Sequence, residues 1–401
     1  MTSPIPLNEA QTRLLKDVAP LGSETIETTA ACGRYLAEPL VARRTQPAGD
    51  LSSMDGYAMR ADDTGGPWLL VGESAAGHPF AGTLGRGEAV RISTGAHVPE
   101  GANAILLQEN AHVSEGTLAI ADPERDRPTD RYIRRKGFDF AAGDMLLSSG
   151  TRIDAASLAL AMAAGVWQLK VGSRPIVSVI DSGDELTARA DPTRPDALPA
   201  SNGPMLAAMC SGLTARTVVP PPVSDSRSAL REALGAAADS DVIVTTGGAS
   251  VGDHDHVRAA LEDWGATIDF WRVAIRPGKP LLVARKGGIT VLGLPGNPVS
   301  AFVTAHLFLL PLLRRMAGAG DPLPRFIEAR LSGALPVGGA RQEFMRGVWA
   351  DGGVAAIAER DSSALHALAN ADVLIERPIG APAALDGDSV RVLALKNGGD
   401  A

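Results

Sequence analysis

From Pro175 onwards, short apolar runs alternate with segments of helical pattern, and this alternation limits the folds open to the chain. The runs PIVSVID, TARTVVP, DVIVTT, FWRVAI and ITVLGLP predict strands, and most of the segments between them predict helices. Strands that alternate with helices of this length are typical of a parallel sheet with right-handed crossovers. We therefore predict a multidomain α/β protein whose central domain, residues 174–316, is built on a parallel sheet.

The regions on either side of this alternation have different patterns. Residues 44–140 carry short β-type runs broken by Gly and Pro, and they predict a projecting, mostly β unit. The flanking segments 1–43 and 141–173 include helical stretches, the second with Asp154 as its N-cap, and they predict one discontinuous linking domain. After the linker AGAGDPLP, residues 317–401 predict a small β-barrel or sandwich.

Charge and composition exclude several classes of function. The formal net charge of −8 argues against a general binder of nucleic acid or of anionic membranes. The two cysteines, Cys32 and Cys210, lie far apart and have no CxxC context, so we expect neither a disulfide framework nor a zinc site. The N-terminal residues lack a signal-peptide pattern, and the apolar run AASLALAMAAGVW is too short to span a bilayer. We expect a soluble, cytoplasmic protein with no nucleic-acid or membrane partner.

Acids, glycines and bases follow the predicted strands at the points where the strands end. PIVSVI is followed by Asp181, Asp184 and Glu185, and DVIV is followed by TTGGASVGDHD. FWRVAI is followed by RPGKP, and ITVLG is followed by LPGNPVS. In an open parallel sheet, ligands bind at this carboxyl edge. A pyrophosphate would meet backbone N–H groups and cations there, and the carboxylates would hold a Mg²⁺ that makes acids and phosphates compatible neighbours.

Each of these features has a simpler explanation when it is taken alone. A GG turn is most often only a tight turn, and an acid at a helix start is commonly a cap. His254 and His256 invite a metal hypothesis, but their i,i+2 spacing points the two rings apart. What favours a site is the convergence of four turns with complementary chemistry on one edge. HExxH and Walker A motifs are absent from the sequence.

The same stretches resemble one family over nearly the full chain. They are SSMDGYAMR, RISTGAHVPEGANAILLQE, IRRKGFDFAAGD, DSGDELT, TTGGASVGDHD, IRPGKP and GLPGNPVSAF. In this order they are similar to the molybdopterin molybdenumtransferase family, which includes bacterial MoeA and the E domain of gephyrin. The resemblance implies insertion of molybdate into adenylylated molybdopterin with release of AMP, in molybdenum cofactor biosynthesis. It also implies Mg²⁺ as cofactor, four subdomains and a homodimer whose active site is shared between subunits.

The resemblance also implies roles for particular residues. It assigns catalysis to Asp55, Thr94, Asp139, Glu185, Asp225, Asp255 and Lys279, with Glu185, Asp225 and Asp255 as the metal ligands. It assigns substrate binding to Gly247, Gly248, Ser250, Arg272, Arg276, Pro295 and Pro298, and molybdate binding to Arg341 or Arg346 and to Ser362 or Ser363.

Two features depart from the family pattern. Arg272 and Arg276 stand where the family commonly has lysine, which keeps the charge but changes its geometry to a planar fork. Phe138 and Phe140 flank Asp139, and we expect them to bury that acid more than usual.

Two other functions are open at this point. The central domain also resembles the molybdopterin adenylyltransferase fold, so the chain could adenylylate molybdopterin, or could contact such an enzyme as a partner. From a different class, the chain could be a non-catalytic scaffold of the gephyrin type. The N- and C-terminal regions match the molybdenumtransferase and not the compact adenylyltransferase. The scaffold role uses an additional fused domain and a long linker, which this sequence lacks.

Overall fold

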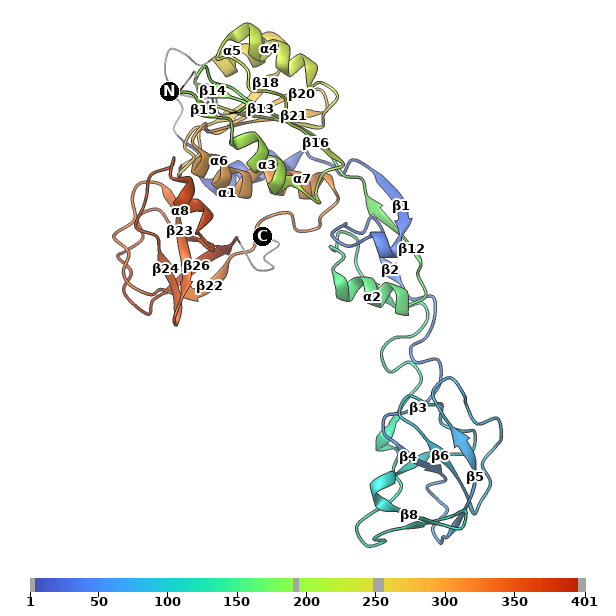
Figure 1. The fold of residues 1–401 in the computed structure, drawn as a ribbon. Coiled ribbons are helices and arrows are strands. Elements are labelled where there is room, and N and C mark those ends of the chain that lie inside the picture. Colours follow the sequence, from blue (N-terminus) through green and yellow to red (C-terminus); the bar gives the residue numbers. More distant parts are fainter. Residues whose placement is uncertain (1–3, 190–194, 248–255, 396–401) are drawn as a thin grey trace.

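The computed structural model describes residues 4–189, 195–247 and 256–395 of the chain. Figure 1 shows an elongated molecule. A layered α/β body lies at one end with the C-terminal β structure beside it, and a slender linking segment leads to a separate β-rich unit at the other end. The β-rich unit therefore projects away from the α/β sheet of its own chain.

The α/β body is organised around a mixed sheet. Among the described residues its strand order is β16-β13-β17-β21-β20-β18. The strands are β13 (Ile176–Asp181), β16 (Arg216–Val218), β17 (Val242–Thr246), β18 (Thr267–Trp271), β20 (Leu282–Lys286) and β21 (Ile289–Leu294). The first four in spatial order pair in parallel, as expected. β20 and β18 are antiparallel additions at one edge.

The predicted strand FWRVAI is interrupted, because the chain turns in the middle of it. β18 ends at Trp271, and Arg272 takes a φ of 94°, a backbone conformation that rarely suits a side chain with a Cβ. The following residues form β19 (Ile275–Arg276), which pairs with a strand of the C-terminal region and not with the α/β sheet. The sheet gains β20 instead, which forms a hairpin with β21 around Gly287 and Gly288.

Helices cover both faces of this sheet, because alternate strand residues point to opposite sides. Val177 and Val244 belong to the core on one face, whereas Ile180 and Ile243 belong to the core on the other. The helices of this body are α1 (Leu7–Lys16), α3 (Asn202–Cys210), α4 (Arg227–Ala236), α5 (His256–Trp264), and the continuous run of α6 (Pro298–Thr304), π-helical η4 (Ala305–Leu309) and α7 (Leu310–Met316). α4 and α5 pack together on one side, and α1, α3 and α6–α7 share the other (Figure 1).

The position of α1 differs from what the sequence suggested. α1 packs on the α/β core, where Leu7 and Leu14 are buried and the Gln11 amide donates to the Leu307 carbonyl at 2.9 Å. The expected grouping of residues 1–43 with the linking domain therefore does not describe this helix. The run Pro298–Met316 is long and apolar enough to cross a membrane, but 83% of it is buried in the fold as a core helix.

The linking segment is built from two distant stretches of chain. β1 (Ser23–Glu27) pairs antiparallel with β12 (Gln168–Gly172), and β2 (Leu40–Val41) pairs with β11 (Met145–Leu147). These strands, the short η1 (Thr28–Ala30) and α2 (Ala155–Ala163) surround a common core. The Asp154 carboxylate accepts the Ser157 N–H at 2.7 Å, so the predicted N-cap is present.

The projecting unit contains a sheet with the order β7-β4-β6-β5-β9-β8. Its strands are β4 (Gly56–Met59), β5 (Trp68–Ser74), β6 (Glu88–Ile92), β7 (Ala104–Leu107), β8 (Ala111–Ser114) and β9 (Thr117–Ile120), with η2 (Gln108–Asn110), η3 (Asp130–Tyr132) and the short pair β3 (Leu51–Ser52) and β10 (Ile133–Arg134).

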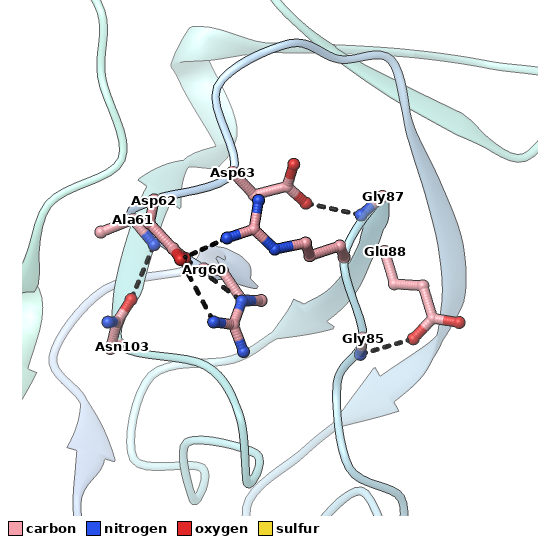
Figure 2. Close-up of polar contacts among 9 residues, drawn as sticks. Arg60, Ala61, Asp62, Asp63, Gly85, Gly87, Glu88 and Asn103 are labelled. Atoms are coloured by element: carbon pink, nitrogen blue, oxygen red, sulfur yellow. Dashed lines mark hydrogen bonds and ion pairs between the residues drawn. The ribbon is translucent and has the colours of Figure 1, made fainter.

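Ion pairs and hydrogen bonds from acidic side chains connect the loops of this unit (Figure 2). Asp62 binds Arg60 at 3.2 Å and Arg86 at 2.9 Å, and Asp63 accepts the Gly87 N–H at 2.5 Å.

The C-terminal region closes into a small barrel. Its strands are β22 (Ile327–Arg330), β23 (Gln342–Ala350), β24 (Gly353–Ala356), β25 (Val373–Arg377) and β26 (Ser389–Ala394), and α8 (Leu365–Ala369) covers one side. β23, β25, β26 and β22 pair in succession, and β24 pairs with β23. A bridge from Leu331 to Val354 joins the end of β22 to β24, which closes the ring. The remaining described strands, β14 (Leu186–Thr187) and β15 (Leu198–Pro199), form a small pair beside the α/β sheet.

The cap of α2 supplies a first prediction. Replacing Asp154 by Ala removes the acceptor of the Ser157 N–H, and we expect the free energy of unfolding to fall by about 1 kcal/mol. Asp154→Asn, the matched control, keeps a capping oxygen, and its free energy of unfolding should fall by at most a few tenths of a kcal/mol. Urea denaturation of the three proteins measures the difference. Equal losses for both variants would contradict the capping role.

Candidate active site

The strand-end edge of the α/β sheet is held together by one buried carboxylate. Asp181, the last residue of β13, is 2% exposed. Its Oδ1 accepts the Thr246 hydroxyl at 2.5 Å, and its Oδ2 accepts the Gly203 N–H, at the start of α3, at 2.9 Å. A Cβ on Gly203 would lie 2.8 Å from that oxygen, so this approach requires glycine. Asp181 thus fixes the ends of β13 and β17 relative to α3.

The predicted acids follow directly from this anchor. The turn after β13 lies beside the turn after β16, because Gly183 N–H donates to Val223 O at 3.1 Å and Asp225 N–H donates to Asp184 Oδ1 at 3.1 Å. Glu185 is exposed at the rim of the same edge. Asp225 Oδ1 is buried, and within the described part of the chain it has no hydrogen-bond partner. A buried carboxylate oxygen of this kind needs a cation or a donor.

The glycine turn after β17 makes a close backbone contact. Gly247 has a φ of 86°, and a Cβ there would lie 2.3 Å from the Ser182 carbonyl oxygen. Gly296 of the LPGNP turn approaches the same glycine, and its carbonyl accepts from the Asn202 amide at 2.6 Å. Three strand-end turns therefore meet at Gly247. The predicted residues Gly248, Ser250 and Asp255 lie outside the described residues.

The LPGNP turn connects the α/β body to the barrel. Pro295 is buried after β21, and Pro298 is the first residue of α6. Asn297 does not cap α6 with its side chain; its amide donates instead to the Ser362 hydroxyl at 2.7 Å. Val299 N–H donates to the Ser362 carbonyl at 3.0 Å. Ser362 therefore positions the start of α6, in addition to its predicted place beside the substrate.

A cavity of about 630 Å³ opens at this connection. The β19 segment and its following turn, the start of α6, and the barrel segments 341–346 and 359–362 line it. Among the described residues, five bases and three acids line it, namely Arg276, Lys279, Arg341, Arg346 and Arg360, and Glu343, Glu359 and Asp361. Arg276 lies 3.3 Å from Glu343, and Lys279 is exposed at the rim. The structure thus brings Lys279, Arg276, Arg341 and Ser362 together, whereas Arg272 does not line the cavity.

Arg346 has a different role from Arg341. Arg346 is 4% exposed, and its guanidinium donates to the carbonyl oxygens of Ala364, Glu359 and Asp361 at 2.6–3.0 Å. Burial lowers its pKa, and the neighbouring acids only partly oppose that effect. These bonds shape the turn that carries the two serines. Arg341 also lines the cavity and is only partly buried.

The second serine is also engaged within this turn. Ser363 donates through its N–H and its hydroxyl to Asp361 Oδ1, at 2.8 and 2.6 Å. These two bonds lower the pKa of Asp361. Asp361 therefore stays ionised and orders the turn, and the Ser362 hydroxyl is the one that bonds toward α6.

The residues predicted in the projecting unit form their own small group. Asp55 Oδ1 accepts the Thr94 N–H at 2.6 Å and the Thr94 hydroxyl at 2.9 Å, and these bonds lower the pKa of Asp55. Figure 1 places this unit at the opposite end of the molecule from the α/β body.

Asp139 is exposed, and Phe138 beside it is 75% exposed. The expectation that Phe138 and Phe140 bury Asp139 is therefore wrong, because only Phe140 turns into the core.

Sequence reasoning missed two positioning residues of the site. In the sequence, Asp181 is one of several turn acids, although its place as the last residue of a mostly buried strand indicates an internal anchor. Asn297 belongs to the LPGNP turn, and nothing local indicates its bond to Ser362, 65 residues away. Among the described residues no group of three or more His, Cys, Asp or Glu side chains is arranged to hold a metal ion.

Comparison with known proteins identifies the family. Residues 5–165 match the model of the MoeA N-terminal region (domain I and II), residues 178–315 match a probable molybdopterin binding domain, and residues 328–395 match the MoeA C-terminal region (domain IV). A molybdopterin molybdenumtransferase of Nostoc sp. is 34% identical over 81% of this chain and 77% of its own length. The chain belongs to the molybdopterin molybdenumtransferase family.

Other relatives and a solved structure agree with this assignment. A molybdopterin molybdenumtransferase of Staphylococcus aureus is 30% identical over 98% of this chain and 96% of its own length. The crystal structure of the molybdopterin biosynthesis moeA protein of Pyrococcus horikoshii is 25% identical, with a TM-score of 0.84 over 98% of this chain and all of that one. The chain is therefore a transferase of molybdenum cofactor biosynthesis with the multidomain α/β fold of these proteins.

The close approach at Gly247 is open to a direct test. In Gly247→Ala, both the positive φ and the contact with Ser182 O oppose the new methyl group. Gly212→Ala is the matched control, because Gly212 has a φ of 84° and open space around its Cβ position. We expect the control to lose about 1–2 kcal/mol of unfolding free energy from backbone strain alone. Gly247→Ala should lose more and should also lose activity, as measured by urea denaturation and product release. Equal stability of the two variants would contradict the steric role of Gly247.

Proposed function

We propose that this protein inserts molybdate into adenylylated molybdopterin and releases AMP, forming the molybdenum cofactor. The observation that carries the proposal is the cationic cavity between the α/β body and the barrel, next to the strand-end turns. Its excess of basic over acidic residues suits a tetrahedral oxyanion such as molybdate. The turns at Gly247 and Gly296 meet beside it and suit the approach of a phosphate to the backbone.

The roles of the residues follow from their positions. Lys279 and Arg276 offset negative charge on the phosphates and on the incoming oxyanion. Arg341 binds the molybdate, and Ser362 positions the molybdate beside the start of α6. Arg346 and Asp361 do not touch the substrate, because their hydrogen bonds shape the turn that presents the serine. Asp181 keeps the strand ends in register beneath the substrate.

The acids at the strand ends fit a magnesium ion. Asp225 offers a buried oxygen without a partner among the described residues, and Glu185 is exposed at the same edge. Carboxylate oxygens are the ligands that Mg²⁺ prefers. We propose that Glu185, Asp225 and Asp255 hold Mg²⁺, although Asp255 lies outside the described residues. When bound, the ion would neutralise charge on the pyrophosphate of the substrate.

We also propose that the active protein is a homodimer with shared sites. Asp55 is held ionised by its hydrogen bonds from Thr94, on a unit that projects away from the strand-end edge of its own chain (Figure 1). A two-fold arrangement would bring this pair, together with the exposed Asp139, to the edge of a partner subunit, and it would create two such sites.

The remaining proposals concern the setting of the enzyme. We place it in the cytoplasm, with a molybdopterin adenylyltransferase as a contact that delivers the adenylylated substrate. An adenylyltransferase activity of the chain itself and a scaffold role are not favoured, because the family matches extend to the N- and C-terminal regions as well. AMP release that requires both molybdate and Mg²⁺ is the decisive assay. Formation of adenylylated product from ATP without molybdate would overturn the choice.

Lys279 provides a quantitative test of the oxyanion cavity. Lys279→Ala removes an exposed cation at its rim, and we expect molybdate to bind about tenfold more weakly, with a smaller dependence on salt. Lys16→Ala, at the exposed end of α1, is the control and should bind as the wild type does. Calorimetric titration with molybdate at two salt concentrations measures both effects. Unchanged affinity would place Lys279 among ordinary surface charges.

The shared site can be tested by complementation. Asp55→Asn and Glu185→Gln should each be inactive as homodimers. A heterodimer of the two retains one cleft with both wild-type acids, so about half of the wild-type AMP release should return. The two chains carry different affinity tags, and sequential purification isolates the mixed dimer. Activity no higher than that of either parent would mean that Asp55 does not act across a subunit boundary.

A further inference from the structure

A second cavity lies where the linking segment meets the α/β body. Its volume is about 810 Å³. The linking segment contributes Cys32, Gly33, Tyr35 and residues 149–152, α3 contributes Met209, the turn after it contributes 211–213, and one stripe of the long helical run forms a wall. It shares no lining residue with the cavity beside Lys279. The proposed reaction makes no use of it.

The charge of this cavity is strongly positive. Four arginines line it, namely Arg152, Arg174, Arg314 and Arg325, and the one acid among the described lining residues is Asp321. Arg314 is 9% exposed. Burial lowers its pKa, the Tyr35 hydroxyl opposes this, and the nearby positive charge of Arg152 lowers it further. Guanidinium groups that are held close together and partly desolvated repel one another, and an anion between them would relieve that repulsion.

A buried histidine adds a second, independent observation. Phe302, His306, Leu310 and Arg314 follow one another at i,i+4 spacing and line the cavity as one stripe. His306 is 9% exposed, its ring packs edge-on to Phe302 at 4.7 Å, and its Nδ1 has no hydrogen-bond partner within the described residues. Burial lowers its pKa to about 4, so the ring is neutral at pH 7. A buried polar atom without a partner is costly and calls for a ligand.

The local helix geometry supports the same interpretation. His306 lies in η4, the π-helical turn Ala305–Leu309 within an otherwise α-helical run. Single π-turns inside α-helices are frequently found at functional sites, because they reposition the side chains on one face. Here that face carries His306 and Arg314, which line the same cavity as Arg152 of the linking segment.

We propose that this cavity binds a dianionic tetrahedral oxyanion of the phosphate class, either as a free ion or as the head of a phosphomonoester. Arg314, Arg152 and Arg174 would bind its oxygens by charge-assisted hydrogen bonds. Neutral His306, with its proton on Nδ1, would donate a hydrogen bond to one of these oxygens. The bound anion would join the linking segment to the helical run, whose first turn carries Val299 at the active site. The site is thus placed to influence how the projecting unit is held relative to the α/β body.

Calorimetric titration with inorganic phosphate and with AMP tests the binding. All proteins carry Lys279→Ala, so that the site beside Lys279 contributes little. We expect Arg174→Gln and Arg314→Gln each to weaken binding about tenfold. Arg216→Gln, which alters an exposed arginine of β16 outside the cavity, should change nothing. Arg174 is only half-buried, so its variant keeps the test valid if Arg314→Gln fails to fold.

Each outcome of the titration has a definite meaning. Binding of both probes, weakened by the two cavity variants, supports the proposal for the phosphomonoester form. Binding of phosphate alone supports the free-ion form. Binding of neither probe, or equal affinities in the cavity variants and the Arg216→Gln control, would overturn it.

A crystal soaked in selenate locates the anion directly, because selenium scatters anomalously. We expect a peak beside Arg314 and His306. Selenate found solely beside Lys279, or nowhere, would refute the second site. The proposed transferase activity stands or falls separately, because it is measured by AMP release from the unmodified protein.

Discussion

The buried carboxylate of Asp181 is the interaction on which the strand-end edge depends. A carboxylate removed from water is stable only when hydrogen bonds replace its hydration, and each bond to such a charge contributes about 1.5–3 kcal/mol. Asp181 obtains them from Thr246 at the end of β17 and from Gly203 at the start of α3. Because these bonds satisfy the charge of Asp181, they also set the positions of two strand ends and one helix. The backbone contact between Gly247 and Ser182 is possible only within that frame.

A second constraint joins the α/β body to the barrel. Ser362 accepts two hydrogen bonds from the start of α6, and Arg346 donates to backbone carbonyls of the turn that carries Ser362. β19 strengthens the connection, because it leaves the α/β sequence to pair with β23. The cavity beside Lys279 lies in this junction. Its cations come from both bodies, so its geometry depends on their packing and not on either one alone.

Periodicity predicted the parts of this fold that have local causes. The parallel strands β13, β17 and β21, the helices between them and the cap at Asp154 were all evident in the sequence. The direction of β18 and β20 was not, because an apolar run does not reveal which neighbour it pairs with. In the site, the resemblance indicated Lys279, Arg276, one of Arg341 and Arg346, and one of Ser362 and Ser363. It could not separate Arg341 from Arg346, because the loop carbonyls that engage Arg346 are brought to it by tertiary structure.

The discontinuous linking segment has a consequence for how the protein is made. Glu27 and Gln168 are hydrogen-bonded neighbours although 141 positions separate them along the chain. During synthesis, β1 therefore waits without its partner until the whole projecting unit has left the ribosome. That unit has its own core and can fold in the meantime, and its closed fold keeps the two ends of its chain near each other. Early folding of the insertion thus lowers the entropic cost of the later pairing, because it replaces a long flexible loop by a compact body.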